Sequence, residues 1–472
     1  MNDRRRVRRL APLGLLAPLL TSAALAKPLT IPAPASSRFA LENGLRVIVV
    51  EDHRLPVVAL ALRFGAGALR EPAGKAGLSN LTAELLASGA AVRSRAQIEE
   101  ALEAIGGSYS ARAWWDATDL LLQVHSRDRG AAIELLADLA LRPVFAPAEV
   151  ESVRERTLQI IALQATSADR VAADALAHLL YGDGRLGRPR IGTASSVRAL
   201  TRDDVVRFHR GLYVGHNAVL VVVGAVRAEE MRSEIARAFG ALPAGAAPPA
   251  IVPPRPAGYD TRMLVIDWPG AERAAISCGH LGIDRRHADY EALRLDNEVL
   301  GGLAGNSRLA LQLSTRRELV DDVYAHLLAL SVPGPFVMRT TASHDDVPPV
   351  IAAALAEIER LRLSGPSAKE LRDAKTYLIG GLPFALESAG GSALALLKIE
   401  TYGLGDNYLT GYGERIENIS QREAAQAART FYVSSAVRCA VVGDAAQLVE
   451  QLAPLGRVTR LDAAGWDQQA VP

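Results

Sequence analysis

The histidines are the first residues to consider for metal binding or acid–base chemistry, and their spacing suits neither. The chain has nine histidines. The closest pairs, His209 with His216 and His280 with His287, are each seven residues apart and lack a supporting arrangement of carboxylates. Two histidines on a helix bind zinc together when they are one turn apart and so share a face. The sequence therefore shows no ligand cluster and no nucleophile–base pair.

The two cysteines, Cys278 and Cys439, are the other candidates for special chemistry. The sequence contains no C-x-x-C pair, so we expect neither a cysteine zinc site nor a redox dithiol. In an oxidising compartment the two could form a disulfide. Each lies in an apolar, strand-like run (AAISCGHLG and AVRCAVVGD), which is equally typical of a buried free thiol. Both alternatives stay open.

Composition and charge favour a globular protein that does not bind nucleic acid. Of the 472 residues, 49% are hydrophobic and 22% are charged, as in ordinary folded domains. The formal net charge is +1, so the strongly basic surface that nucleic acid requires is not expected.

The N-terminus has the pattern of a secretory signal peptide. A basic leader, MNDRRRVRRL, precedes a short apolar stretch, and Ala24-Leu25-Ala26 forms an A-x-A cleavage pattern. We expect residues 1–26 to be removed on export and the mature chain to lie in the periplasm, with no stable membrane span. A retained anchor is the alternative, but the stretch is short and contains two prolines.

The second half of the chain repeats the pattern of the first. The segment LTRDDVVRFHRGLYVGHNAVLVVVGAV (200–226) aligns without gaps with ISQREAAQAARTFYVSSAVRCAVVGDA (419–445), at an offset of 219 residues. Each begins with a Thr or Ser that can cap a helix, followed by an amphipathic helix and a buried strand. A looser match relates residues 147–161 to 367–381. Residues 241–258 are rich in Ala and Pro, which predicts a linker between the halves.

Within each half, strands come first, helices follow and a strand returns at the end. Residues 45–52 and 57–67 are predicted strands, and residues 95–107 are a predicted helix with one apolar face. This order predicts an α+β fold with two homologous α/β sandwich domains in tandem, at 38–240 and 259–460. We expect each to be a mainly antiparallel sheet with helices packed on one face.

Two segments resemble a known family. LENGLRVIVVEDHRLPVVALALRFGAGALREPAGKAGL (41–78) is similar to the opening hairpin of the M16 metallopeptidases, which include insulinase-like and mitochondrial processing peptidase-like enzymes. LLYGDGRLGRPRIGTASSVRALTRDDVVRFHRGLY (179–213) resembles a further run of that family. The resemblance covers about 38–455 and implies that both predicted domains are M16 domains.

The resemblance identifies a helix that has lost its chemistry. Active M16 members carry H-x-x-E-H on the first helix after the hairpin, where two histidines bind zinc and the glutamate is the general base. Laid along GLSNLTAELLASG, the first histidine position falls on Asn80, the base on Ala83 and the second histidine on Glu84. The family's downstream glutamate ligand falls at or next to Ile161. The resemblance thus implies a degenerate member without catalytic residues, metal or cofactor.

Degenerate M16 chains of this short type often pair with an active one, and this implies the function that we expect. The partner would be a zinc-bearing M16 peptidase in a heterodimer, and zinc is expected only there. The two chains would enclose a peptide substrate, which binds in the active chain by adding a strand to a sheet edge. The alternative is a scaffolding or binding protein of another envelope assembly. A peptidase with an unrecognised site is disfavoured, because no ligand or nucleophile cluster is visible.

A substrate-binding pair is a further expectation from the family. Its non-catalytic chain often supplies an Arg and a Tyr seven residues apart, after a glycine-rich stretch. Without gaps these positions fall on Ser314 and Asp321, and a shift of three residues reaches Arg317 and Tyr324. An Arg could bind a carbonyl or oxyanion. The other interpretation places Arg317 on a solvated surface and Tyr324 in the next strand.

Two smaller motifs also have alternative interpretations. Gly301, Gly302 and Gly305 could form a loop that touches peptide, or a helix end and turn, and we favour the turn. The tryptophan pair in WWD, 114–116, could line a chamber. We favour a place in a strand, with one Trp packed and the other near the surface.

Overall fold

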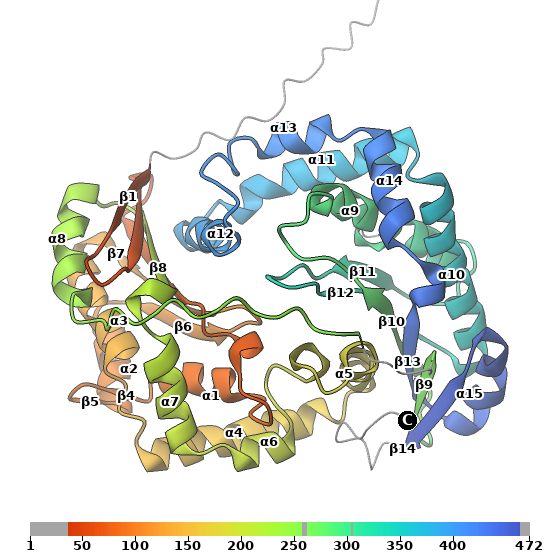
Figure 1. Ribbon diagram of the computed structural model, residues 1–472, viewed down its shortest axis with the longest axis horizontal. Helices are drawn as coiled ribbons and strands as arrows, with labels where there is room; N and C mark the ends of the chain where they lie inside the picture. The colour runs from red at the N-terminus through yellow and green to blue at the C-terminus, as the bar shows by residue number, and fades with distance from the viewer. Residues whose placement is uncertain (1–35, 257–261, 304, 463–472) are drawn as a thin grey trace, which may run out of the picture.

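The computed structural model describes residues 36–256, 262–303 and 305–462, so the predicted signal peptide lies outside the described residues. Two six-stranded sheets lie on opposite sides of the molecule (Figure 1). Most neighbouring strands are antiparallel, and helices cover each sheet. The predicted α+β fold with two sandwich domains is confirmed.

The two sheets have the same strand order. The first runs β1-β2-β8-β3-β7-β6, and the second runs β14-β9-β13-β10-β12-β11. Both contain a parallel pair at the corresponding place, β2 with β8 and β9 with β13. The first sheet consists of β1 (Ser36–Ala40), β2 (Arg46–Glu51), β3 (Val57–Phe64), β6 (Ser108–Ala113), β7 (Thr118–His125) and β8 (Ala218–Gly224). The second consists of β9 (Met263–Asp267), β10 (Ala274–Leu281), β11 (Val323–Leu327), β12 (Pro335–Ala342), β13 (Arg438–Gly443) and β14 (Val458–Asp462).

The outer helices pack on the far face of each sheet, as predicted. In the first half they are α1 (Leu78–Leu85), α2 (Arg95–Ala104), α3 (Arg129–Leu141), α4 (Pro147–Gln164), α6 (Ala194–Ala199), α7 (Arg202–Leu212) and α8 (Ala228–Phe239). In the second half they are α9 (Tyr290–Asn297), α10 (Val347–Ser364), α11 (Ala368–Ala385), α13 (Tyr412–Asn418), α14 (Gln421–Phe431) and α15 (Ala445–Leu452). Strands β4 (Gly89–Ala90) and β5 (Arg93–Ser94) form a small separate hairpin.

The repeat seen in the sequence is a structural repeat. Helices α7 and α14 begin and end at the same offset, since 421 − 202 and 431 − 212 both equal 219. Each starts with a capping box, in which Thr201 or Ser420 bonds the first turn. Tyr213 and Tyr432, just after the two helices, are both 2% exposed. The repeated residues therefore place the same helix end against each core.

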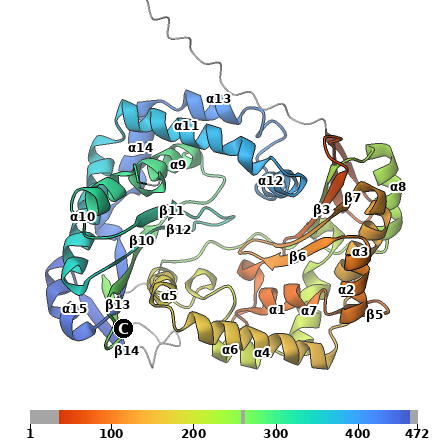
Figure 2. The same cartoon turned by 180° about the vertical axis from the view of Figure 1, so that it is seen from behind.

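One helix from each half crosses to the sheet of the other half. Helix α5 (Ala168–Tyr181) packs on β10 and β13 of the second sheet. Helix α12 (Ala389–Tyr402) packs on β3 and β8 of the first sheet. Both lie on the inner side of the molecule, between the two sheets (Figures 1 and 2). The expectation of helices on one face only is therefore incomplete, because each sheet is covered on both faces.

Residues 243–256 form neither helix nor strand, as their prolines predict. This segment follows α8 and leads towards β9. The Arg70 side chain donates a hydrogen bond to the Pro249 carbonyl, which ties the segment to the first half.

Cys278 and Cys439 form a disulfide in the core of the second half. They lie directly opposite each other on the neighbouring strands β10 and β13, with Cα atoms 4.0 Å apart. Of the two alternatives left open by the sequence, the structure shows the paired one.

Among the described residues, no single helix has both the length and the apolar composition needed to cross a membrane. Helices α11 and α12 would meet these criteria only as a pair, and that pair is bent by 118°.

The crossing helices predict that the two halves unfold together. Leu397 of α12 is fully buried against the first sheet. Leu397→Ala should lower the free energy of unfolding by about 2–5 kcal/mol, because it leaves a cavity in that core. Urea unfolding followed by circular dichroism should show a single transition at a lower midpoint. Leu163→Ala, at a side chain that is 72% exposed, is the control. Separate transitions for the two halves would contradict this account.

Candidate functional site

A cavity of about 1040 Å³ lies between the two halves, and residues from both line it. Its walls come from β6, the turn after it, the inner face of α12, helices α9 and α11, and the loop between β11 and β12. The lining is rich in aromatic and cationic side chains, namely Trp114, Trp115, Tyr290, Tyr377, Tyr402, Tyr408, Tyr412, Arg63, Arg112, Arg285, Arg294 and Lys398. We call this cavity the chamber.

The two tryptophans line the chamber from a turn, not from a strand. The Trp114 amide donates to the Ala117 carbonyl at 2.7 Å, which closes a tight turn between β6 and β7. The backbone of this turn also accepts hydrogen bonds from the amides of Ala68 and Leu69. The strand expectation is therefore wrong for these residues, and the alternative of a chamber wall is correct. Trp114 is 43% exposed, and Trp115 packs against the core that contains α5.

Asp116, the last residue of WWD, joins three parts of the chain. Its carboxylate accepts a hydrogen bond from the Tyr402 hydroxyl on α12, at 2.8 Å. It also accepts hydrogen bonds from the amide and hydroxyl of Ser331 in the second half. Sequence reasoning missed this contact, because the partners are 286 and 215 residues away.

A buried ion pair fixes the inner helix to the first sheet. Arg63 donates to both carboxylate oxygens of Asp119, at 2.5 and 2.7 Å. It also donates to the Thr401 hydroxyl of α12 at 2.8 Å. Removing either charge would leave the other buried without a partner, at a cost of about 3–5 kcal/mol.

On the opposite wall, arginines and tyrosines of the second half form a compact cluster. The Arg285 guanidinium lies 3.7 Å from the centre of the Tyr290 ring, within cation–π distance. The Tyr408 hydroxyl donates to Glu291 at 2.6 Å, and Arg285 contacts the same carboxylate at 3.3 Å. The acidic group of this wall is thus used within the protein.

On helix α1, which resembles the zinc helix of the family, the residues at the motif positions contact other side chains of the protein. Asn80 donates to Glu84 at 2.9 Å, one turn along α1. Arg156 of the neighbouring helix α4 lies 3.3 Å from the other oxygen of Glu84. Ala83 is 1% exposed and Ile161 is half-buried, and neither offers a ligand atom.

These residues do not fit a zinc ion. The one carboxylate, Glu84, is already paired with an amide and a guanidinium, and a guanidinium repels a cation placed beside it. Within the part of the chain that the structure describes, no group of three His, Cys, Asp or Glu side chains is placed to hold a metal.

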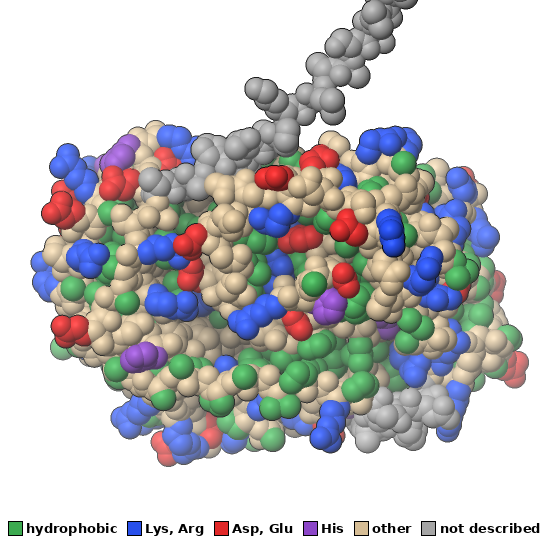
Figure 3. All heavy atoms as spheres, turned by 45° about the horizontal axis from the view of Figure 1, so that its top comes forward, with side chains coloured by type: hydrophobic (Ala, Val, Ile, Leu, Met, Phe, Trp, Pro, Cys, Tyr) green, Lys and Arg blue, Asp and Glu red, His purple; other side chains and the backbone are tan. Residues whose placement is uncertain are grey.

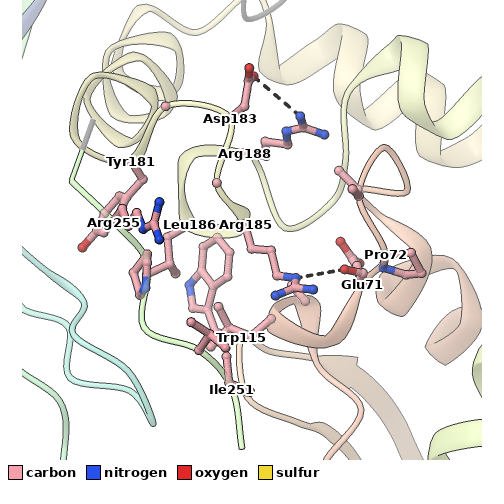
Figure 4. A pocket seen from close by; sticks show the side chains of 18 of the residues that line it. Glu71, Pro72, Trp115, Tyr181, Asp183, Arg185, Leu186, Arg188, Ile251 and Arg255 are labelled. Carbon is pink, nitrogen blue, oxygen red and sulfur yellow. Dashed lines mark hydrogen bonds and ion pairs between the residues drawn. The ribbon is translucent and has the colours of Figure 1, made fainter. Parts of the chain in front are cut away.

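Helix α1 is nevertheless firmly anchored at its start. The Glu71 carboxylate accepts hydrogen bonds from the amides of Gly77 and Ser79 and from the Ser79 hydroxyl. Burial raises the pKa of Glu71 to about 7, while these hydrogen bonds act in the opposite direction. Glu71 lines a second cavity of about 580 Å³, where Arg185 donates to its backbone carbonyl and Trp115 forms part of the wall (Figure 4). Packing and these hydrogen bonds therefore hold helix α1 in place.

Each histidine of the two sequence pairs has its own contact within the protein. His209 is buried, and its Nε2 lies 2.9 Å from the Ala140 carbonyl. His216 bonds the Ala244 carbonyl, and His280 bonds the Leu281 carbonyl. His287 Nδ1 lies 3.8 Å from Asp289. These contacts indicate structural roles for the four histidines.

Arg317 and Tyr324 do not line the chamber. Arg317 lies in an exposed turn, and Tyr324, 47% exposed, lies on the edge strand β11 beside His326. The ungapped alternatives contact each other, since the Ser314 hydroxyl donates to the Asp321 carbonyl.

The three glycines have conformational and packing reasons to be glycine. A Cβ on Gly301 would lie 2.5 Å from that of Ala325, and Gly305 has a φ of +67°. Gly302 closes a π-helical turn, Glu298–Gly302. A helix end followed by a turn therefore describes this segment, and none of the three glycines lines the chamber.

Comparison with known proteins identifies the family of this chain. The model of insulinase (peptidase family M16) matches residues 46–194, and that of the peptidase M16 inactive domain matches residues 199–378. The chain belongs to the M16 peptidase family. The M16 resemblance inferred from the sequence is thereby confirmed.

Curated relatives of this M16 chain cover most of its length. An uncharacterised zinc protease of Mycobacterium leprae is 29% identical over 366 residues, which are 75% of this chain and 79% of the relative. One from Rickettsia bellii is 25% identical over 407 residues, or 85% of this chain and 96% of the relative.

Solved structures share the M16 fold. A peptidase M16 inactive domain from Pseudomonas fluorescens has a TM-score of 0.81 at 24% identity, covering 87% of this chain and 98% of that one. A protease from Helicobacter pylori has a TM-score of 0.78 at 18% identity, covering 87% and 99%.

The buried His209 predicts a loss of stability in acid. Burial lowers its pKa to about 4, below the ordinary value of 6.5, so protonation favours the unfolded chain. The stability that the neutral His209 side chain contributes is complete above about pH 6.5 and is lost as the pH falls towards 4. The loss should be roughly 3 kcal/mol for this residue. Urea unfolding at several pH values should show a flatter dependence for His209→Gln than for the parent chain. A matched control is His53→Gln, at an exposed side chain, which should leave the slope unchanged.

Zinc binding should depend on restoring the lost side chains. The parent chain, dialysed against zinc and then buffer, should retain no stoichiometric zinc by atomic absorption. Asn80→His, Glu84→His and Ile161→Glu together should bind about one equivalent, because they supply two imidazoles and a carboxylate. The two histidine substitutions without Ile161→Glu form the control and should bind more weakly. A full equivalent of zinc on the parent chain would contradict the site as described.

Proposed function

We propose that this chain is a non-catalytic M16 subunit that pairs with a zinc-bearing M16 peptidase and helps to enclose peptide substrates in the periplasm. The observation that carries the proposal is helix α1, where Asn80, Ala83 and Glu84 occupy the positions of the zinc ligands and the general base. The family match and the presence of an M16 inactive domain support it.

The chamber supports a peptide-binding role. Ligand pockets usually have a volume of about 300–1,000 Å³, and the chamber is slightly larger than that range. Strand β6 forms part of its wall and is one of the two edge strands of the first sheet. An extended peptide can add to such an edge through main-chain hydrogen bonds. Binding would then need no catalytic residue from this chain.

The need for a partner follows from what the chain lacks. A peptide held in the chamber meets no metal-activated water and no nucleophile–base pair from α1. Hydrolysis would require a second M16 chain that carries H-x-x-E-H. In this arrangement the Arg317 and Tyr324 surface, which lies outside the chamber, is available to the partner or to its substrate.

The test is a mixing experiment with a fluorogenic peptide library. The chain alone should not hydrolyse any member. A histidine-bearing M16 homologue should cleave peptides faster when this chain is added, and the two should co-elute as a heterodimer. Arg156→Ala in this chain should leave the stimulated rate unchanged, because Glu84 and Arg156 have no catalytic part. Co-elution with a different envelope assembly, without any effect on a peptidase, would favour the scaffolding alternative.

A further inference from the structure

The chamber lining has an excess of positive charge. Five cationic side chains line it, Arg63, Arg112, Arg285, Arg294 and Lys398, against three acidic ones, Asp116, Asp119 and Glu298. The outer face of the molecule in Figure 3 instead carries both signs interspersed. The question is which of the chamber charges are free to meet a ligand.

Arg112 is left without an acidic partner by the arrangement of the first sheet. In the strand register, Arg112 of β6 is opposite Asp119 of β7, which is opposite Arg63 of β3. Side chains in such a row share one face of the sheet. Asp119 gives both carboxylate oxygens to Arg63. Arg112, at the edge of the row and exposed, pairs with no carboxylate in the described part of the chain.

The other two acidic groups of the lining, Asp116 and Glu298, have other surroundings. Asp116 accepts hydrogen bonds from Ser331 and Tyr402. Glu298 is half-buried, and this burial raises its pKa. Neither of these two carboxylates forms an ion pair with Arg112 in the described part of the chain.

Two further cations lie close to the same wall. Lys398 is exposed on the chamber face of α12 and has no ion-pair partner among the described residues. Arg190 donates to the carbonyl of Ala113, the last residue of β6, and its guanidinium lies 4.8 Å from the centre of the Trp114 ring. The end of the free edge strand is therefore cationic and aromatic.

Alternate residues of this strand face the chamber. Ser110 and Arg112 of β6 both line it, as the two-residue period of a strand requires, and Trp114 lines it from the turn that follows the strand. A peptide added along β6 would place one side chain opposite Arg112 and another, two residues away, towards Trp114. A carboxylate suits the first position, because a guanidinium binds it with two charge-assisted hydrogen bonds. An apolar side chain suits the second.

From this geometry we infer that the chamber selects extended peptides with an acidic residue two positions from an apolar one. The inference rests on the proposed peptide-binding function and specifies its substrate class. Lys398 adds attraction for a second acidic group, and an acidic peptide approaches a cationic chamber faster at low salt.

The test is fluorescence anisotropy with labelled peptides of alternating sequence, using the chain from Lys27 onward. A Glu-Val peptide should bind at least about tenfold more tightly than its Gln-Val counterpart, because one charge-assisted hydrogen-bonded pair is lost. Arg112→Gln should remove most of this preference, whereas Arg112→Lys should keep part of it. Lys369→Gln, at an exposed lysine on α11 outside the chamber, is the matched control and should change nothing.

The other possible outcomes would overturn either the acidic preference alone or the peptide-binding function as well. Equal binding of the Glu and Gln peptides would overturn the acidic preference and leave the peptide-binding function standing. Failure of every peptide to bind would overturn both. If Arg112→Gln weakened the Gln peptide as much as the Glu peptide, with an unchanged melting temperature, Arg112 would not be a charge-selective residue.

Discussion

The structure depends on a reciprocal exchange, in which helices α5 and α12 each cover the sheet of the other half. Without α12 the inner face of the first sheet would expose residues such as Val221 and Ala61, both fully buried. Exposing an apolar sheet face costs about 25 cal/mol for each Å². The exchange therefore makes the two halves one unit and fixes the width of the chamber between them. Hydrogen bonds from Arg63 to Thr401 and from Tyr402 to Asp116 also fix the orientation of α12 on the first sheet.

The position of helix α1 is likewise fixed by packing and by hydrogen bonds. Helix α1 packs its leucines into the first core, and Glu71 bonds the amides at its start. Neither role needs a metal. On this helix the Glu84 carboxylate contacts Asn80 and Arg156, so its charge is balanced by the protein itself.

Much of the fold could be predicted because its signals are local. Capping residues such as Thr201 and Ser420, and the buried Tyr213 and Tyr432, recur at a fixed offset, so the duplication is visible in the sequence. The departures of α1 from H-x-x-E-H follow from the resemblance to the M16 family, which places the motif positions on Asn80, Ala83 and Glu84. The crossing of α5 and α12, the turn formed by WWD and the role of Asp116 could not be predicted. They depend on packing and on hydrogen bonds between residues hundreds of positions apart.

The central claim is that an M16 scaffold has been retained as a chamber wall while its zinc site is lost. Native mass spectrometry in zinc-containing buffer, with and without a histidine-bearing M16 homologue, tests this most directly. We predict a metal-free species for the isolated chain and a heterodimer that carries about one zinc on the partner. An isolated chain that retained one zinc and lost it on substitution of its own residues would contradict the account.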